Sequence, residues 1–155
     1  MESKTLCLDR DPGDYTALNR EIESYWDARS RAFSKVRLRE LAGPSRKAWQ
    51  NLLAQRLPQG RSLRILDIGT GAGFFAILLA GMGHQVVGID MSGDMLHEAK
   101  QNAMASGVSV KFQKMDAQVL SFADDSFDVV ISRNLTWTLP DVMAAYREWQ
   151  RVLKP

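Results

Sequence analysis

One continuous stretch decides the fold of this chain: Leu63-Arg64-Ile65-Leu66-Asp67-Ile68-Gly69-Thr70-Gly71-Ala72-Gly73. Its first half, residues 63–68, has the apolar character of a short buried strand, interrupted near the end by Asp67. The second half places glycines at alternate positions, and the apolar run 74–80 then opens a buried helix. A strand, a glycine turn and a helix in this order let backbone N–H groups meet a ligand at close range.

The bulk composition is that of one ordinary globular domain. The chain has 155 residues, of which 45% are hydrophobic and 25% charged, and its formal net charge is +2. We expect no membrane span, because no apolar run approaches the ~20 residues that a span needs. The single cysteine, Cys7, excludes an internal disulfide framework and favours a reducing, cytoplasmic location. The two histidines, His84 and His97, have no cysteine cluster beside them, so we expect no metal site.

Strand and helix patterns alternate from residue 62 onward. After the first helix, the expected elements are a strand over 85–89 ended by Asp90, a helix from Ser92 to Gly107, a strand from Val108 to about Lys114, a strand over 127–132, and a helix opened by Pro140-Asp141. This order predicts parallel strands joined by right-handed crossovers, with helices on both faces of the sheet.

The first 60 residues predict a helical N-terminal extension. After a turn at Asp11-Pro12-Gly13, helical patterns start at Tyr15, continue through residues 33–41, and resume over 44–57. The aromatic residues of the first two helices fit either core packing or a lid over the glycine turn: Tyr25, Trp26 and Phe33. A basic stripe on the second helix fits a solvated face or, alternatively, a phosphate-binding surface: Arg31, Lys35 and Arg39.

Three acids stand at the carboxyl ends of three consecutive predicted strands. Asp90 can accept both hydroxyls of a nucleoside ribose, and Asp116 can accept the exocyclic amine of a base. Asp67 can face a cationic amine. Singly, each acid fits a helix cap or a solvated loop equally well; together they predict one ligand crevice.

The glycine spacing and the acidic residues exclude two classes of nucleotide ligand. A P-loop needs a lysine after its last glycine, which this chain lacks, and the NAD fingerprint needs a third glycine where Phe74 stands. Several carboxylates would repel a pyrophosphate, whereas they attract a sulfonium and an amine. The sequence therefore favours S-adenosylmethionine over NAD.

With these residues in place, the sequence resembles the class I S-adenosylmethionine-dependent methyltransferases, in particular small-molecule enzymes similar to the quinone-biosynthesis methyltransferases. The matching segments are Leu66 to Gly73, Val87 to Ser92, Met115-Asp116-Ala117, Phe127 to Asn134, and the closing Arg151 to Pro155. The resemblance covers residues 62–155. It implies a Rossmann-like α/β domain over 61–155, with residues 1–60 as a helical extension or lid.

The resemblance also implies where the cofactor lies. The glycine turn, Gly69, Thr70, Gly71 and Gly73, would pass under the methionine part, whose amine Asp67 would help to hold. Asp90 would bind the ribose and Met91 would pack on the adenine. Asp116 and Ala117 would meet the amino edge of the adenine, and the backbone of Asn134 would lie near the methyl donor.

The acceptor is less defined by the sequence. In-line methyl transfer needs alignment and a dry site more than a catalytic side chain, and we expect a small-molecule acceptor. Four aromatic residues can wall the acceptor pocket, although each of them fits ordinary packing better: Tyr15, Tyr25, Trp26 and Trp137. Residues 134–137 depart from the Asn/Asp-Pro-Pro-aromatic motif, which argues against DNA adenine methylation. Two alternatives stay open: a nucleic-acid methyltransferase that uses the basic stripe, and a noncatalytic S-adenosylmethionine-binding module.

One departure from the family concerns the sheet. The family order, 3-2-1-4-5-7-6, would here keep only 3-2-1-4, which leaves the apolar strand 127–132 as an exposed edge. We predict either that the chain is a truncated or proteolysed piece, or that it forms a homodimer through this edge.

Overall fold

The computed structural model describes residues 15–155, so Cys7 and the predicted turn at 11–13 lie outside the described residues. The elements follow one another in this order: α1 (Thr16–Asp27), α2 (Ser30–Ala42), α3 (Pro44–Arg56), β1 (Arg64–Ile68), α4 (Phe74–Gly81), β2 (Gln85–Asp90), α5 (Gly93–Ala105), β3 (Lys111–Lys114), β4 (Val129–Ser132), a 3₁₀ turn η1 (Thr136–Thr138) and α6 (Val142–Val152). The predicted alternation of strands and helices is confirmed from β1 to β3, whereas β4 follows β3 with no helix in the described residues between them.

The four strands form one parallel sheet in the predicted order, β3-β2-β1-β4. The central strand β1 pairs on both sides, so that Ile65 lies opposite Val86 on one neighbour and Val129 on the other. Among the described strands β4 is bonded to β1 alone, which confirms its place at the edge of the sheet. Pairing of this edge with a second copy stays a prediction.

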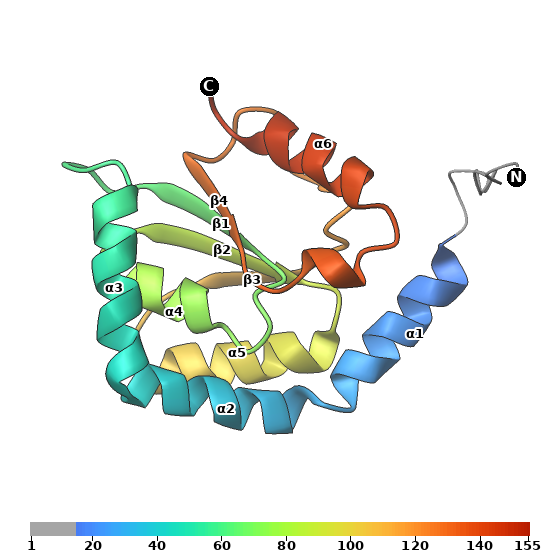
Figure 1. Cartoon of the computed structure of the whole chain (residues 1–155), viewed down its shortest axis with the longest axis horizontal. Coiled ribbons are helices and arrows are strands. Elements are labelled where there is room, and N and C mark those ends of the chain that lie inside the picture. Colours follow the sequence, from blue (N-terminus) through green and yellow to red (C-terminus); the bar gives the residue numbers. More distant parts are fainter. Residues whose placement is uncertain (1–14) are drawn as a thin grey trace, which may run out of the picture.

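Helices cover both faces of the sheet, as Figure 1 shows with α6 on one side and α4 and α5 on the other. Side chains of β1 pack into two separate hydrophobic cores, one on each face of the sheet, because successive side chains of a strand point to opposite faces. Ile65 packs in the cluster with α4, whereas Leu66 and Ile68 pack in the cluster that includes Val152 of α6. All of these side chains are fully buried.

Two strands begin later than the sequence predicts. The expected strand from Val108 begins at Lys111, because the backbone N–H of Val108 still bonds back into α5 and pairing with β2 starts three residues later. The expected strand from Phe127 begins at Val129. The backbone of Phe127 instead bridges to Leu153 after α6, which ties the start of β4 to the end of the chain.

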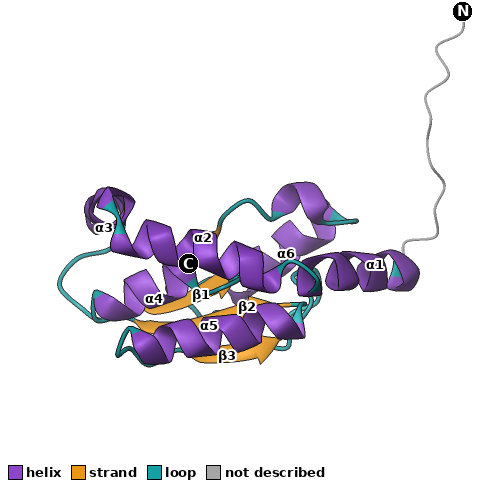
Figure 2. Ribbon diagram, turned by 90° about the horizontal axis from the view of Figure 1, so that it is seen from below, coloured by secondary structure: helices purple, strands orange, loops and turns teal. Residues whose placement is uncertain are grey.

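The three N-terminal helices lie within the predicted extension, residues 1–60. Helix α2 packs against α3, α4 and α5, and α1 reaches the end of α5 (Figure 2). Helix α1 contains no buried residue, so few apolar contacts hold it. The division into an extension and a separate domain stays a prediction. Within residues 15–155, none of the helices combines the length and apolar character that crossing a membrane requires.

Candidate functional site

A cavity of about 300 Å³ opens at the carboxyl ends of the central strands, where open α/β sheets bind their ligands. Nine of the ten cofactor residues predicted from the sequence line it: Asp67, Gly69, Thr70, Gly71, Asp90, Met91, Asp116, Ala117 and Asn134. Asp67 and Asn134, which are 67 positions apart in the chain, thus line the same cavity. The tenth predicted residue, Gly73, is not among the lining residues.

Two glycines of the turn serve different purposes. Gly73 begins α4 with φ +88°, and a Cβ there would lie 3.2 Å from the Cβ of Ala99, so this glycine lets α4 and α5 pack closely. Gly71 lines the cavity with φ +53°, and a Cβ there would lie 3.0 Å from the ring of Phe33. The turn therefore fits closely against α5 at one end and α2 at the other.

Asp67 joins the end of β1 to the start of α4. Its Oδ2 accepts hydrogen bonds from the hydroxyl of Thr70 at 2.6 Å and from the backbone N–H of Ala76 at 3.1 Å. Burial raises the pKa of this carboxyl to about 7; the two hydrogen bonds oppose that effect and the nearby charge of Asp90 adds to it. A cationic group in the cavity would favour the ionised form of Asp67. The predicted contact of Asp67 with an amine stays a prediction.

Asp90 fixes the glycine turn from the end of β2. One carboxylate oxygen accepts the backbone N–H of Gly71 and the other accepts that of Ser92, each at 2.9 Å. Burial raises the pKa of Asp90, and these backbone hydrogen bonds act against the rise. Asp90 thus lies between the turn and α5, with its side chain on the cavity wall.

Asp116, after β3, is held by its neighbours on both oxygens. Its Oδ1 accepts the backbone N–H of Gln118 at 2.8 Å and the side-chain amide of Gln118 at 3.1 Å. Its Oδ2 accepts the side-chain amide of Asn19, from α1, at 3.1 Å. The acid at the end of the third strand therefore touches the N-terminal extension directly.

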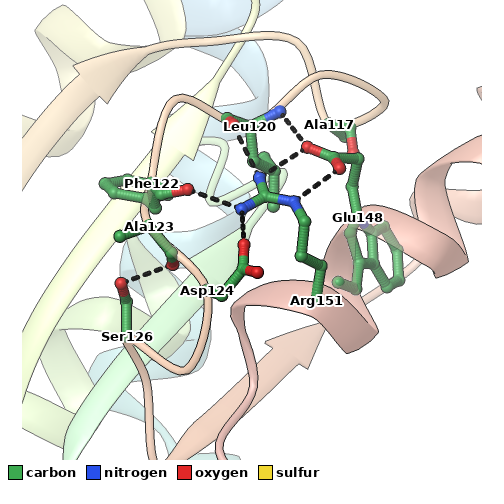
Figure 3. Close-up of polar contacts among 9 residues, drawn as sticks. Ala117, Leu120, Phe122, Ala123, Asp124, Ser126, Glu148 and Arg151 are labelled. Atoms are coloured by element: carbon green, nitrogen blue, oxygen red, sulfur yellow. Dashed lines mark hydrogen bonds and ion pairs between the residues drawn. The ribbon is translucent and has the colours of Figure 1, made fainter.

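Helix α6 anchors the loop that carries Asp116 and Ala117 (Figure 3). The guanidinium of Arg151 donates to the carbonyl oxygens of Leu120 and Phe122, at 2.9 and 2.8 Å, and pairs with Glu148 and Asp124. The indole N–H of Trp149 donates to the carbonyl oxygen of Ala117 at 2.8 Å. Pairing with Arg151 lowers the pKa of Glu148, so this carboxylate is ionised near neutral pH. The carboxyl-terminal helix thereby shapes one wall of the cavity.

The N-terminal helices form the roof of the cavity, which we define by its lining residues from α1 and α2: Asn19, Ile22, Trp26, Phe33 and Arg37. This arrangement supports the lid interpretation for Trp26 and Phe33. Tyr25 is 47% exposed and does not line the cavity, so its predicted place beside the acceptor is not confirmed. Tyr15 is likewise absent from the lining residues.

Polar contacts fasten the roof to the ends of the strands. Glu23 pairs with Lys114 at the end of β3, and the hydroxyl of Ser92 donates to the carboxylate of Asp27. With the contact between Asn19 and Asp116, α1 is held at the carboxyl ends of both β2 and β3.

Two arginines line the cavity near the start of α4. Arg37 of α2 and Arg133, directly after β4, both pair with Glu40, in the latter case at 3.0 Å. The Arg133 guanidinium lies 5.2 Å from the ring centres of Trp49 and Phe74. Neither arginine was predicted from the sequence as a site residue. Arg37 carried one available signal, since it lies one helical turn after Phe33 on the same face.

Residues 133–140 form another wall of the cavity. Asn134 adopts φ +58°, a conformation that asparagine tolerates, and is exposed where it follows β4. Trp137 lines the cavity as predicted and is 73% exposed, so much of its ring faces solvent. The basic stripe of α2, in contrast, is exposed and lies outside the cavity: Arg31, Lys35 and Arg39.

Comparison with known proteins agrees with this architecture. YcgJ of Bacillus subtilis, an uncharacterized methyltransferase, is 40% identical over 92 residues, which are 59% of this chain and 36% of that protein. The demethylmenaquinone methyltransferase of Staphylococcus aureus is 35% identical over 112 residues, or 70% of this chain and 46% of that enzyme. The chain thus spans between about a third and a half of the length of these relatives.

The solved structure of YcgJ superposes with a TM-score of 0.64 at 36% identity, over 68% of this chain and 45% of that one. The family model described as a methyltransferase domain matches residues 65–155, which hold the sheet, the glycine turn and all of the predicted cofactor residues. This chain therefore belongs to the methyltransferase-domain family.

Proposed function

We propose that the cavity binds S-adenosylmethionine and that the protein transfers the methyl group of this cofactor to a small-molecule acceptor by in-line displacement. One observation carries the proposal: nine residues predicted from the sequence alone to contact this cofactor line a single cavity of suitable size. Family membership supports the same reading.

The residues present fit the cofactor part by part. Asp90 is the candidate for the ribose hydroxyls, and Met91 for the face of the adenine. The turn at Gly69 and Gly71 lines the cavity where the resemblance places the methionine part. Asp67, whose pKa lies near 7, can balance a positive charge brought into the buried site.

The cofactor supplies the reactivity, since its sulfonium carries an activated methyl group. The protein's share is to hold the two reactants in line and to keep water out. Alignment of this kind contributes on the order of 7–11 kcal/mol to barrier lowering. Phe33 lies against the turn at Gly71, and Trp26 packs on Phe33. The segment 133–140 lines the same cavity, so the roof and this wall can exclude water from the reacting centre.

Two observations support a small aromatic methyl acceptor: the residues that line the cavity and the names of similar proteins. Leu135, Trp137 and Leu139 give the 133–140 wall an apolar, partly aromatic surface. A small aromatic acceptor would pack on such a surface. The names of the relatives, which include demethylmenaquinone and ubiquinone-biosynthesis methyltransferases, support the same class.

Turnover measurements test the proposal. The protein is incubated with methyl-labelled S-adenosylmethionine and a panel of hydroxylated quinones and phenols, and release of S-adenosylhomocysteine is followed by mass spectrometry. We expect release of S-adenosylhomocysteine that depends on the acceptor and is lost in Asp90→Ala. The control variant Asp94→Ala, which changes an exposed acidic residue in the first turn of α5, should keep this release. Cofactor binding without release from any panel member would overturn the transferase function and favour a noncatalytic binding module.

A further inference from the structure

Among the roof residues, Asn19 of α1 has a side-chain amide whose hydrogen bonding fixes its orientation. Its side-chain amide lines the cavity and donates from Nδ2 to Oδ2 of Asp116 at 3.1 Å. An ionised carboxylate only accepts hydrogen bonds, so the NH₂ end of the amide must face Asp116. Asp116 therefore fixes the orientation of the Asn19 amide, and the carbonyl oxygen Oδ1 becomes the free end.

That carbonyl oxygen is buried and has no hydrogen-bond donor among the described residues. Buried polar atoms are nearly always paired, because an unpaired one forfeits its hydration without compensation. An orphaned acceptor on a side chain that lines a ligand cavity is therefore explained best by a donor that the ligand brings.

Asp116, the residue that the family resemblance assigns to the adenine amine, already accepts on both oxygens. Gln118 donates to it from its backbone and its side chain, and Asn19 donates to the other oxygen. The Gln118 side chain is fixed in turn, because its Oε1 accepts the backbone N–H of Asp141 at 2.7 Å. Asp116 thus behaves as the centre that orients two amides.

We propose that Oδ1 of Asn19 accepts a hydrogen bond from the exocyclic amine of the cofactor's adenine, with Asp116 holding the amide in place. This inference rests on the proposed function, which brings S-adenosylmethionine into the cavity. The terminal amide torsion of asparagine is soft, so a small rotation suffices to meet the ring. Asn19 would then distinguish adenine, which presents a donor at this position, from a 6-oxo purine, which presents an acceptor.

The placement of α1 supports this role. Glu23 and Asp27 lie one and two helical turns beyond Asn19 and fasten the helix to Lys114 and Ser92, at the ends of β3 and after β2. The helix therefore crosses the site where the resemblance places the nucleoside. Asn19 is the first of these three contacts, beside Asp116 and Ala117.

The test compares two ligands that differ at one position of the base. Titration calorimetry measures binding of S-adenosylhomocysteine and of S-inosylhomocysteine, whose base carries an oxygen in place of the amine. We expect the parent chain to prefer the adenine ligand by about tenfold or more, because the inosine oxygen would face a buried acceptor. In Asn19→Ala the preference should fall by about fivefold or more, mainly through weaker binding of S-adenosylhomocysteine.

Two matched variants distinguish recognition of the adenine amine by Asn19 from a general weakening of the contacts that hold α1. Glu23→Gln removes the ion pair of α1 with Lys114 and leaves Asn19 intact, so it should weaken both ligands equally and leave their ratio unchanged. Arg20→Ala, on the exposed side of the same helix, should change neither affinity. Circular dichroism confirms that each variant is folded.

The outcomes are distinguishable. A parent chain that binds S-adenosylhomocysteine with a ratio unchanged in Asn19→Ala would overturn the assignment of Asn19 alone. Tighter binding of S-adenosylhomocysteine by Asn19→Ala would also overturn it, since Asn19 would then compete with the adenine for Asp116. No binding of S-adenosylhomocysteine by the folded parent would overturn the proposed function, and this assignment with it.

Discussion

The floor and the roof of the cavity are built in different ways. The floor, formed by the ends of β1 and β2 and the glycine turn, rests on fully buried side chains such as Ile68 and Ile89 and on backbone hydrogen bonds. The first roof helix, α1, has no buried residue and is fastened by polar contacts at Asn19, Glu23 and Asp27. The difference indicates a floor that folds with the core and a roof whose first helix can open at modest cost.

The largest expected loss of stability comes from a mutation in the core beneath the floor. Leu66→Ala removes a fully buried side chain from β1 and should lower the free energy of unfolding by about 2–5 kcal/mol, because a cavity is left in the core. Leu18→Ala is the matched change on α1, where the side chain is 41% exposed, and should stay within about 0.5 kcal/mol. Urea denaturation of both variants measures the contrast. Equal losses would contradict the distinction between floor and roof.

Asp67, in the floor, should make the free energy of unfolding depend on pH. Its pKa is raised to about 7 in the fold, whereas an unfolded aspartate titrates near 3.8. The native state therefore binds the proton more tightly, so the stabilisation from this group is complete below about pH 4 and is lost as the pH rises through 7. Asp67→Asn cannot titrate and should flatten the stability profile between these limits. An unchanged profile in thermal denaturation would refute the raised pKa.

The wall held by α6 should show an intermediate effect. Arg151→Met removes hydrogen bonds from a charged group to the carbonyl oxygens of Leu120 and Phe122, and it unpairs Glu148. The guanidinium is partly exposed, so we expect a loss of unfolding free energy that is smaller than that of Leu66→Ala. Arg147→Met, an exposed neighbour on the same helix, is the control and should be neutral in the same urea titration.

The smallest effect is expected in the roof. Lys114 is more than half exposed and Glu23 partly exposed, so Glu23→Gln should cost less than about 0.5 kcal/mol of stability. Raising the salt concentration should shrink even this difference, since screening weakens exposed pairs. A loss as large as that of Arg151→Met would show that α1 belongs to the folded core.

The floor could be predicted from the sequence because its information is local. A buried strand, alternate glycines and acids at strand ends can each be recognised over a few residues, whereas the sheet order was predicted through the family resemblance. Gly73 was assigned to the cofactor through the family resemblance; its packing against Ala99 depends on a helix that lies elsewhere in the chain. The late start of β4 has a similar cause, because the backbone of Phe127 pairs with Leu153.

The roof resisted prediction because its contacts join residues far apart in the chain. Asn19 meets Asp116, and Arg37 and Arg133 share Glu40. A helical pattern shows which face of α1 or α2 is apolar, but it does not show which strand end lies beneath that face. A single polar residue on a mostly exposed helix carries no periodic signal at all.

The most direct test of the central claim is a calorimetric titration of the chain with S-adenosylhomocysteine. We predict saturable binding of one ligand per chain, weakened by at least about 1 kcal/mol in Asp90→Ala and unchanged in Asp94→Ala, because only Asp90 lines the cavity and anchors the glycine turn. No heat of binding from a chain that circular dichroism shows to be folded would contradict the claim.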